Sequence, residues 1–284
     1  MESSGPVGSP PAPGGPARPS ASGPKGQPVA VPNSLKMSFV LVPPGAFEMA
    51  PRYHVTITKP YRLGATEVTR KQFAAFVKAT GHVTLAEGGA LIKAFAPDPK
   101  APAGTWREPG HPVGDDMPVT WVSAADAEAM ADYLTRTEGV TYRLPTEAEW
   151  RWACRAGAAT RYPFGDTASE LPHYATYKAN TPGFPAYAGG RRPNAWGLYD
   201  MLGNVREWVA DGMGPFPEGA APDPLVIPRP NGYRVQCGGS FAGDPVYAGR
   251  PPGWGHMTCD CDTRLGAYWF VAAKDAGFRL CRDP

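Results

Sequence analysis

The chain has 284 residues, 42% of them hydrophobic and 19% charged, and a formal net charge of +2 at pH 7. A charge this close to zero gives no broad basic field, so we expect no nucleic-acid partner. No apolar run reaches the roughly 18 residues that a membrane-spanning helix needs, so we expect no membrane span. The 34 glycines, 35 prolines and eight tryptophans indicate a loop-rich fold with many turns.

Residues 1–34 are rich in Pro, Gly, Ala and Ser, and they precede a folded domain that we expect at 35–284. A segment with so little apolar surface does not fold alone, which predicts a linker, a disordered tail, or a segment that docks on a protein partner. The run "MSFVLV" at 37–42 is too short for a signal core and lacks a cationic lead-in. No signal peptide is therefore visible, and the compartment stays open, including an extracytoplasmic one if a signal has been trimmed.

The predicted elements begin with two strand-like runs at 37–49 and 53–69. Thr69 caps a helix over 70–80 that stops at Gly81, and Ser123 caps a second helix that stops at Gly139. Residues 83–118 between the two helices are irregular. In "YRLPTEAEWRWACRAG", Thr146 and Glu149 form a capping box for a third helix that closes at Gly157.

Turns follow at 158–195, and a Pro-rich loop follows at 214–230. Two strand-like pieces, "YRVQCGGSF" and "DAGFRLC", end the chain. We expect Arg279 in the second piece to be a buried cation that answers a carboxylate. The other arginines, scattered along the chain, are interpreted as surface or loop-anchoring charges.

Eight segments in this order resemble the sulfatase-modifying-factor family, which is the family of the formylglycine-generating enzyme. They lie at 37–49, 64–82, 118–134, 142–157, 162–166, 194–208, 238–241 ("GGSF") and 277–280 ("GFRL"). The resemblance implies an α+β, C-type-lectin-like fold, loop-rich with few short helices and strands. It leaves the function open, because one fold hosts many chemistries. Family members include copper-dependent cysteine oxidases, iron-dependent sulfoxide-forming enzymes and receptor-like binding proteins.

The resemblance places a structural calcium ion in "NAWGLYDMLGNVREW" at 194–208. Its ligands would be the side chains of Asp200 and Glu207 and the backbone carbonyls of Gly203 and Val205. Carboxylates and turn carbonyls are the oxygen ligands that calcium prefers. The alternative is that both acids only accept hydrogen bonds from loop amides.

The family's copper(I) site uses two cysteines after the GGS-aromatic strand, and copper(I) prefers such soft thiolate ligands. The matching positions carry Gly243 and Ala248, while Ser240 is retained. The family's Trp and His at this site correspond to Arg206 and Asp244. We therefore expect neither bound copper nor formylglycine formation, and the dispersed histidines make iron equally unexpected. A hydrolase using Ser240 lacks a nearby His and acid.

The segment "GWGHMTCDCD" at 253–262 does not fit the family pattern. His256, Cys259 and Cys261 could form a relocated site for a soft metal, copper(I) or zinc. The alternatives are plain thiols or disulfides, because five cysteines leave at least one unpaired. Cys154 could pair with Cys259 or Cys261, and Cys237 with Cys281.

Two functions compete. The first is a non-catalytic binding or assembly subunit of a larger complex, with partner contacts through residues 1–34 and the loops at 83–118 and 214–230. Trp254, Tyr268, Trp269 and Phe270 would add aromatic contact surface, although part of this group is expected in the core. The second is a metal-dependent oxidoreductase that uses the relocated Cys/His site.

Overall fold

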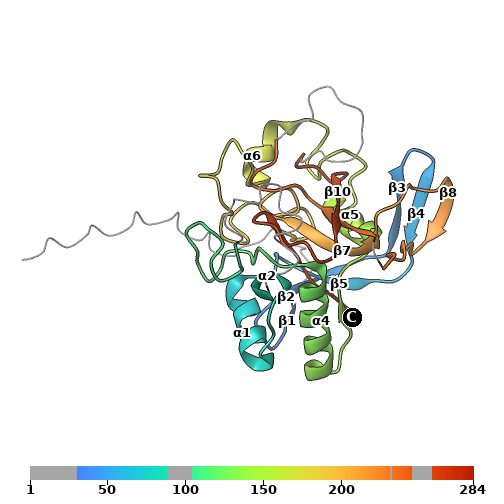
Figure 1. The fold of residues 1–284 in the computed structure, drawn as a ribbon. Coiled ribbons are helices and arrows are strands. Elements are labelled where there is room, and N and C mark those ends of the chain that lie inside the picture. The colour runs from blue at the N-terminus through green and yellow to red at the C-terminus, as the bar shows by residue number, and fades with distance from the viewer. Residues whose placement is uncertain (1–30, 89–103, 231, 245–257) are drawn as a thin grey trace, which may run out of the picture.

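The computed structural model describes residues 31–88, 104–230, 232–244 and 258–284, which form one main body with a small sheet projecting from it (Figure 1). Over these residues, no helix is both long and apolar enough to cross a bilayer. The segment 1–30, most of the predicted tail, lies outside the described residues.

A five-stranded sheet joins both ends of the described chain. Its order is β1 (Val31–Pro32), β2 (Ser38–Val42), β5 (Tyr61–Gly64), β12 (Cys281–Arg282) and β6 (Tyr142–Arg143). All neighbouring strands are antiparallel. Strand pairing begins at β1, four residues before the expected start of the domain at 35.

Two smaller sheets complete the framework. The first has the order β10 (Arg264–Tyr268), β9 (Tyr233–Cys237), β7 (Arg206–Gly212) and β11 (Ala276–Gly277). The second has the order β3 (Gly45–Ala50), β4 (Tyr53–Ile57) and β8 (Gly219–Pro222), and it projects from the body (Figure 1). Its edge strand β3 contacts the main body through the helix α5.

The three longer helices begin at the predicted caps. Helix α1 (Arg70–Thr80) has a Thr69–Gln72 capping box, and α4 (Ala124–Glu138) has a Ser123–Asp126 box. Both end at a glycine with positive φ, as predicted. Helix α5 (Glu147–Arg155) has the predicted Thr146–Glu149 box, but its left-handed C-cap is Ala156, one residue before the predicted Gly157.

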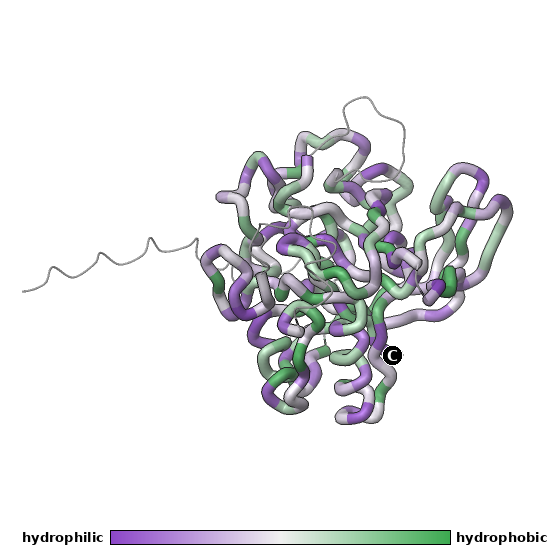
Figure 2. Tube along the Cα trace, viewed as in Figure 1, coloured by the Kyte–Doolittle hydropathy of each residue, from purple (hydrophilic) through white to green (hydrophobic). Residues whose placement is uncertain are grey.

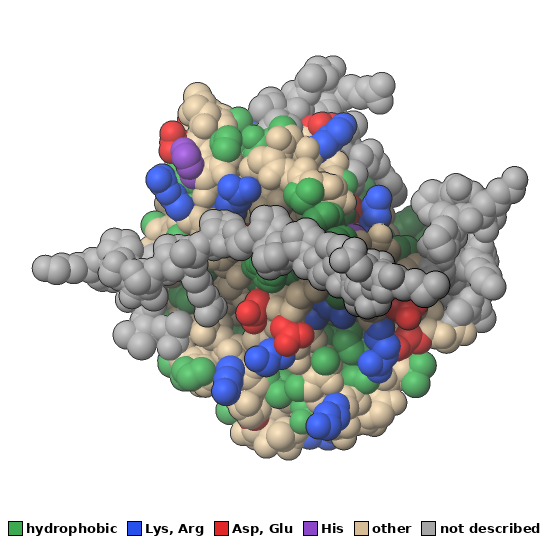
Figure 3. All heavy atoms as spheres, turned by 90° about the vertical axis from the view of Figure 1, so that its left-hand side faces the viewer, with side chains coloured by type: hydrophobic (Ala, Val, Ile, Leu, Met, Phe, Trp, Pro, Cys, Tyr) green, Lys and Arg blue, Asp and Glu red, His purple; other side chains and the backbone are tan. Residues whose placement is uncertain are grey.

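The other helices in the described part of the chain are short: α2 (Leu85–Gly88), η1 (Ala168–Glu170) and α6 (Leu171–Tyr174). The hydrophobic segments run through the inside of the main body, as Figure 2 shows. Trp150 and Trp208 are completely buried there. Short strands, short helices and long loops confirm the predicted α+β, loop-rich fold. One face of the molecule carries Lys, Arg, Asp and Glu side chains interspersed (Figure 3), in agreement with the near-neutral net charge.

Candidate functional site

The segment "GGSF" leaves strand β9 at a point where two backbones nearly touch. Gly238 and Gly239 both have positive φ, at 94° and 70°. A Cβ atom on Gly239 would lie 2.3 Å from the carbonyl oxygen of Thr258. Only glycine fits this position, because a side chain would collide with backbone and the dihedral itself disfavours other residues. The two glycines therefore fix the GGSF turn against the segment that carries Cys259.

Ser240 is completely buried and tied into a charged network. Its hydroxyl donates to Asp275 Oδ2 at 3.0 Å, and the other carboxylate oxygen of Asp275 forms an ion pair with Arg206. Arg206 also donates to Gln236 Oε1 at 3.0 Å. The guanidinium thus sits where the family resemblance expects a Trp, and it neutralises the acid that holds the serine. This arrangement orients the hydroxyl toward a carboxylate that is itself engaged by Arg206.

The two positions that carry copper-binding cysteines in the family, Gly243 and Ala248, have no sulfur atom in this chain. Gly243 is described, and its carbonyl accepts the amide of Lys178 at 3.1 Å. Ala248 lies outside the described residues, as do His256 and Trp254. Asp244, at the family's His position, forms an exposed ion pair with Lys178 at 3.6 Å.

The structure shows which cysteines are paired and which are free thiols. Cys154 and Cys261 form a disulfide, so Cys261 cannot serve as a thiolate ligand in this state. The pairing of Cys237 with Cys281 is wrong: both are free, buried thiols in different sheets. Cys259 is also free and buried, its thiol donates to the carbonyl of Ser240, and burial raises its pKa to about 12. Among the described residues, no three His, Cys, Asp or Glu side chains gather as a metal site.

The aromatic residues at 268–270 are half-buried and contact one another. Tyr268, at the end of strand β10, stacks on Tyr233 and on Phe270, with ring centroids 4.5 and 5.3 Å apart. Trp269 meets Phe270 edge-on at 5.4 Å, packs against the core and donates its indole N–H to the carbonyl of Pro230. The contact surface itself stays a prediction.

The predicted calcium ligand Glu207 lies in a completely buried ion pair. Its carboxylate accepts two hydrogen bonds from Arg279, at 2.6 and 2.7 Å, and one from the Trp150 indole at 2.8 Å. Arg279 and Glu207 are both 0% exposed, which confirms the buried cation that the sequence predicts. Both oxygens of Glu207 are thus already engaged, so this side chain in its present arrangement does not fit a calcium ligand.

The other acid, Asp200, belongs to the same buried cluster. Its Oδ2 accepts the amide of Gly189 at 2.5 Å, and burial raises its pKa to about 6. Glu67 adds a third carboxylate. Asn204 donates to its Oε1 at 2.9 Å, its Oε2 has no hydrogen-bond donor, and burial together with Asp200 raises its pKa well above the usual range. A proton held between Glu67 and Asp200 relieves this repulsion without a metal. Calcium binding itself stays a prediction.

The main cavity lies elsewhere, between the projecting sheet and the body. Its volume is about 1020 Å³, and its lining joins the tip of β3, the loop at 213–216, helix α5 and the segment 258–264. Four arginines take part in this lining: Arg151, Arg155, Arg161 and Arg264. The scattered arginines were interpreted as surface or loop-anchoring charges; Arg151 is 2% and Arg155 7% exposed, and both anchor the segment 258–264 through Asp262.

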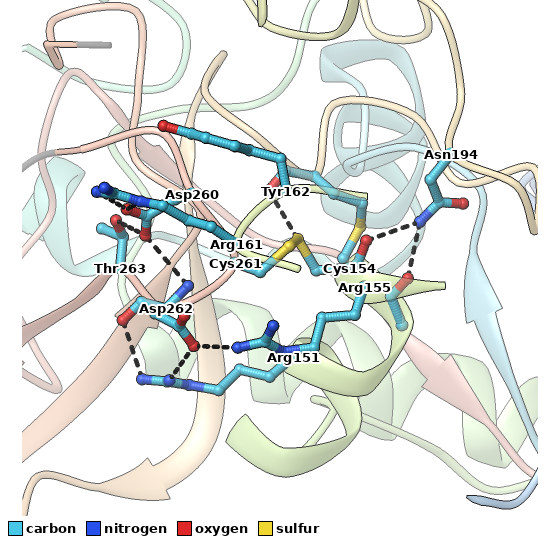
Figure 4. The surroundings of a disulfide bond; sticks show 12 residues. Arg151, Cys154, Arg155, Arg161, Tyr162, Asn194, Asp260, Cys261, Asp262 and Thr263 are labelled. Atoms are coloured by element: carbon cyan, nitrogen blue, oxygen red, sulfur yellow. Dashed lines mark hydrogen bonds and ion pairs between the residues drawn. A yellow bond between two sulfur atoms is a disulfide. The ribbon is translucent and has the colours of Figure 1, made fainter. Parts of the chain in front are cut away.

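Helix α5 carries Arg151 and Arg155, the loop after it carries Arg161, and the segment 258–264 supplies the acids that pair with them (Figure 4). Asp262 Oδ1 accepts from Arg151 at 3.0 Å and from Arg155 at 2.6 Å, and Asp260 pairs with Arg161 at 2.6 Å. The Cys154–Cys261 bond links helix α5 to the segment 258–264. The i, i+4 spacing of Arg151 and Arg155 on the predicted helix was the signal that sequence reasoning missed.

These features define a loop-rich, lectin-like scaffold whose family oxidase positions hold no thiol among the described residues, and which carries a separate arginine-lined cavity. A family model described as "Sulfatase-modifying factor enzyme 1-like domain" matches residues 25–284. The chain therefore belongs to the sulfatase-modifying-factor family, as its sequence motifs predicted.

Among curated proteins, the chain is similar to formylglycine-generating enzymes. It is 33% identical to that of Streptomyces coelicolor, over 78% of this chain and 81% of the relative, and 30% identical to that of Thermomonospora curvata, over 89% and 96%. It is also 32% identical to the hercynine oxygenase of Mycolicibacterium thermoresistibile, over 66% of this chain and 46% of the relative.

Two solved structures share the fold. PvdO from Pseudomonas aeruginosa matches with a TM-score of 0.70 at 24% identity, over 92% of this chain and all of PvdO. Treponema denticola variable protein 1 matches with a TM-score of 0.68 at 21% identity, over 91% of this chain and all of that protein. At these identities the likeness establishes the architecture alone.

Proposed function

We propose that this chain is a non-catalytic binding or assembly subunit of a larger protein complex. The observation that carries the proposal is the composition of the family's oxidase site: Gly243 and Ala248 stand at the positions of the two copper-binding cysteines. Neither side chain can bind copper(I) or form a disulfide with a substrate cysteine. The neighbouring Ser240 donates to Asp275, and the ion pair with Arg206 already engages this carboxylate.

The alternative of an oxidoreductase with a relocated Cys/His site has less support. Of its three residues, Cys261 is in a disulfide and Cys259 is a buried thiol with a raised pKa, which opposes the thiolate that a metal requires. His256 lies outside the described residues. No observation on the described residues favours this alternative.

An oxidation assay tests whether the chain lacks formylglycine-forming activity. The purified full chain is incubated with copper(I), a thiol reductant, oxygen and a cysteine-containing peptide, and the peptide is analysed by mass spectrometry. We expect no formylglycine. A Gly243→Cys/Ala248→Cys double variant serves as the matched arm, and we expect it to compete for copper(I) with a chromogenic chelator while the original chain does not. Conversion of the peptide by the original chain would overturn the proposal.

The loop at 214–230 supports the assembly role. Leu225, Val226 and Ile227 are consecutive and 44%, 37% and 73% exposed, which is unusual for large apolar side chains on a surface. A Leu225→Ser/Ile227→Ser variant should lose a partner that the full chain retains in affinity purification with cross-linking. The control is Val83→Ser, which changes a single isolated side chain that is 66% exposed. Equal partner recovery from all three proteins would remove this loop from the interface.

A further inference from the structure

We propose that the arginine-lined cavity is a binding site for a small organic carboxylate with an apolar body. The proposal deepens the binding function above and rests on it, because it gives that function a ligand. The cavity, at about 1020 Å³, is large enough to enclose a ligand of ordinary small-molecule size. It is distinct from the GGSF turn, whose residues do not line it.

The guanidiniums of the cavity wall share a small set of carboxylates. Glu147, Asp260 and Asp262 pair with the four guanidiniums of Arg151, Arg155, Arg161 and Arg264; these seven side chains form what we call the arginine wall. Four guanidiniums share three partner carboxylates, because Glu147 and Asp262 each bind two of them. Two further acids lie nearby, the exposed Glu48 in the lining and the buried Asp211 beside Arg264, so the region carries no net positive charge.

Hydrogen-bond donors are in excess on the arginine wall. The Nε–H groups of Arg155 and Arg264 are buried and have no acceptor in the structure. A buried donor without a partner costs free energy, and a ligand oxygen that accepts from it recovers that loss. Guanidinium groups offer paired donors whose geometry matches a carboxylate, which favours this anion over a neutral ligand.

Asp262 indicates which group the wall recognises. One of its oxygens bridges Arg151 and Arg155, yet its side chain is 45% exposed at the cavity surface. This carboxylate is supplied by the chain itself and is open to solvent. A ligand carboxylate can bind beside it, or replace it between the two guanidiniums, with the same hydrogen-bond geometry.

Another part of the lining, in contact with the guanidiniums, is apolar. Met49, Met213, Pro215 and Phe216 contribute here, and Phe216 lies under the guanidiniums of Arg264 and Arg151 at 4.3 and 5.2 Å. A cation held on an aromatic face keeps its charge while part of its hydration is removed. The lining thus offers apolar contact next to desolvated cations, and the complementary ligand is an apolar or planar body that carries a carboxylate.

Calorimetric titration with 1-naphthoate tests the proposal on the full chain. We expect saturable binding that weakens with added salt, and binding of the neutral 1-naphthamide at least about tenfold weaker. Inorganic phosphate at matched ionic strength should not displace naphthoate, since it lacks the apolar body. Equal affinity for naphthoate and the amide, or displacement by phosphate at equal concentration, would overturn the proposal.

Two arginines provide a matched pair of variants. Arg264 and Arg234 are each 15% exposed and each bind one carboxylate and one backbone carbonyl, but only Arg264 lines the cavity. Arg264→Gln should weaken naphthoate about tenfold, and Arg234→Gln by less than about twofold. Equal effects of the two variants would place the ligand elsewhere.

Asp262→Asn separates recognition from stability. The amide keeps an acceptor for Arg151 and Arg155 but removes the competing charge, so naphthoate should bind more tightly even if the melting temperature falls. Weaker binding would contradict the proposal. If no naphthoate binds while the partner of the 214–230 loop is still recovered, the cavity assignment fails and the assembly function stands. If naphthoate binds but the partner of the 214–230 loop is not recovered, the assembly function fails and the cavity assignment stands.

Discussion

The Arg279 cluster and the arginine wall arrange buried charge differently. Around Arg279 one guanidinium faces three buried carboxylates, Glu67, Asp200 and Glu207. On the arginine wall four guanidiniums share three partner carboxylates. The first region is closed, and its excess negative charge is answered by a proton. The second opens into a cavity, where a ligand can accept hydrogen bonds from guanidinium donors that lack an acceptor. Burial thus turns the same residue types into a structural lock or a recognition surface.

The largest expected effect is in the closed region. Arg279→Met leaves Glu207 buried without its cation, and the free energy of unfolding should fall by about 3–5 kcal/mol. Naphthoate binding at the cavity should persist in the folded fraction, because neither Arg279 nor Glu207 lines it. Chemical denaturation measures the loss, with Arg52→Met as control, because Arg52 pairs with Glu218 on the exposed surface. A loss no larger than that of the control would show that the cluster does not act as a lock.

The second-largest effect is expected from removing the Cys154–Cys261 disulfide, which should change both the stability and the arginine wall. Cys154 lies between Arg151 and Arg155 in sequence, and Cys261 lies between Asp260 and Asp262, so the disulfide joins the wall's two sides. A Cys154→Ser/Cys261→Ser variant should lose about 2–4 kcal/mol of stability and also bind naphthoate more weakly. A reductant should lower the melting temperature of the original chain and leave that of the variant unchanged. Unaltered naphthoate affinity would separate the disulfide from the site.

A smaller effect concerns pH. The pKa values of Glu67 and Asp200 are both raised, Asp200 to about 6, so the folded state holds protons that the unfolded chain releases. For Asp200 this stability is fully present below about pH 4 and is lost as pH rises through about 6, a change on the order of 3 kcal/mol. Glu67→Gln supplies a permanent amide donor and should raise the stability at pH 8 relative to the original chain.

Denaturation curves between pH 4 and 8 check this prediction. The slope should become smaller in Glu67→Gln but should not vanish, because burial also raises the pKa of Asp211 to about 6. Glu108→Gln, at an exposed acid, is the control and should not change the slope. An unchanged slope in Glu67→Gln would mean that the cluster holds no proton.

The smallest expected effect is that of calcium removal. Because Arg279 already neutralises Glu207, a chelator should shift the melting temperature by less than about 1 °C, well below the change from a 1 kcal/mol loss. The measurement is a thermal melt with and without the chelator. A fall of several degrees that added calcium reverses would instead support the calcium ion that the family resemblance implies.

The sequence predicted most of the local structure and the family. Thr69, Ser123 and Thr146 cap their helices as predicted, because a capping box is a local pattern of residues three positions apart. The end of α5 was misplaced by one residue, since Ala156 adopts the left-handed conformation that glycine usually supplies. Arg279 was predicted as a buried cation from the family-like segment "GFRL".

The cavity could not be predicted in the same way. Its walls come from positions 48–51, 151–155, 213–216 and 258–264, and only the tertiary fold brings them together. The predicted pairing of Cys237 with Cys281 was wrong for the same reason. Both cysteines lie on strand-like pieces at the end of the chain, but only the tertiary fold shows that these strands belong to different sheets. Arg151 and Arg155 were interpreted as surface or loop-anchoring charges, and nothing local identifies Asp262 as the partner that they anchor.

The disulfide also sets a condition for making this protein. Cys259 lies two residues from Cys261 and could form the wrong bond with Cys154 during oxidation. Thiol exchange requires a thiolate, and the pKa of about 12 keeps the buried Cys259 protonated once the GGSF turn has closed over it. The correct pairing is thus protected only after folding. Preparations should be produced under oxidising conditions with an isomerase present, and their thiols should be counted before any ligand is titrated.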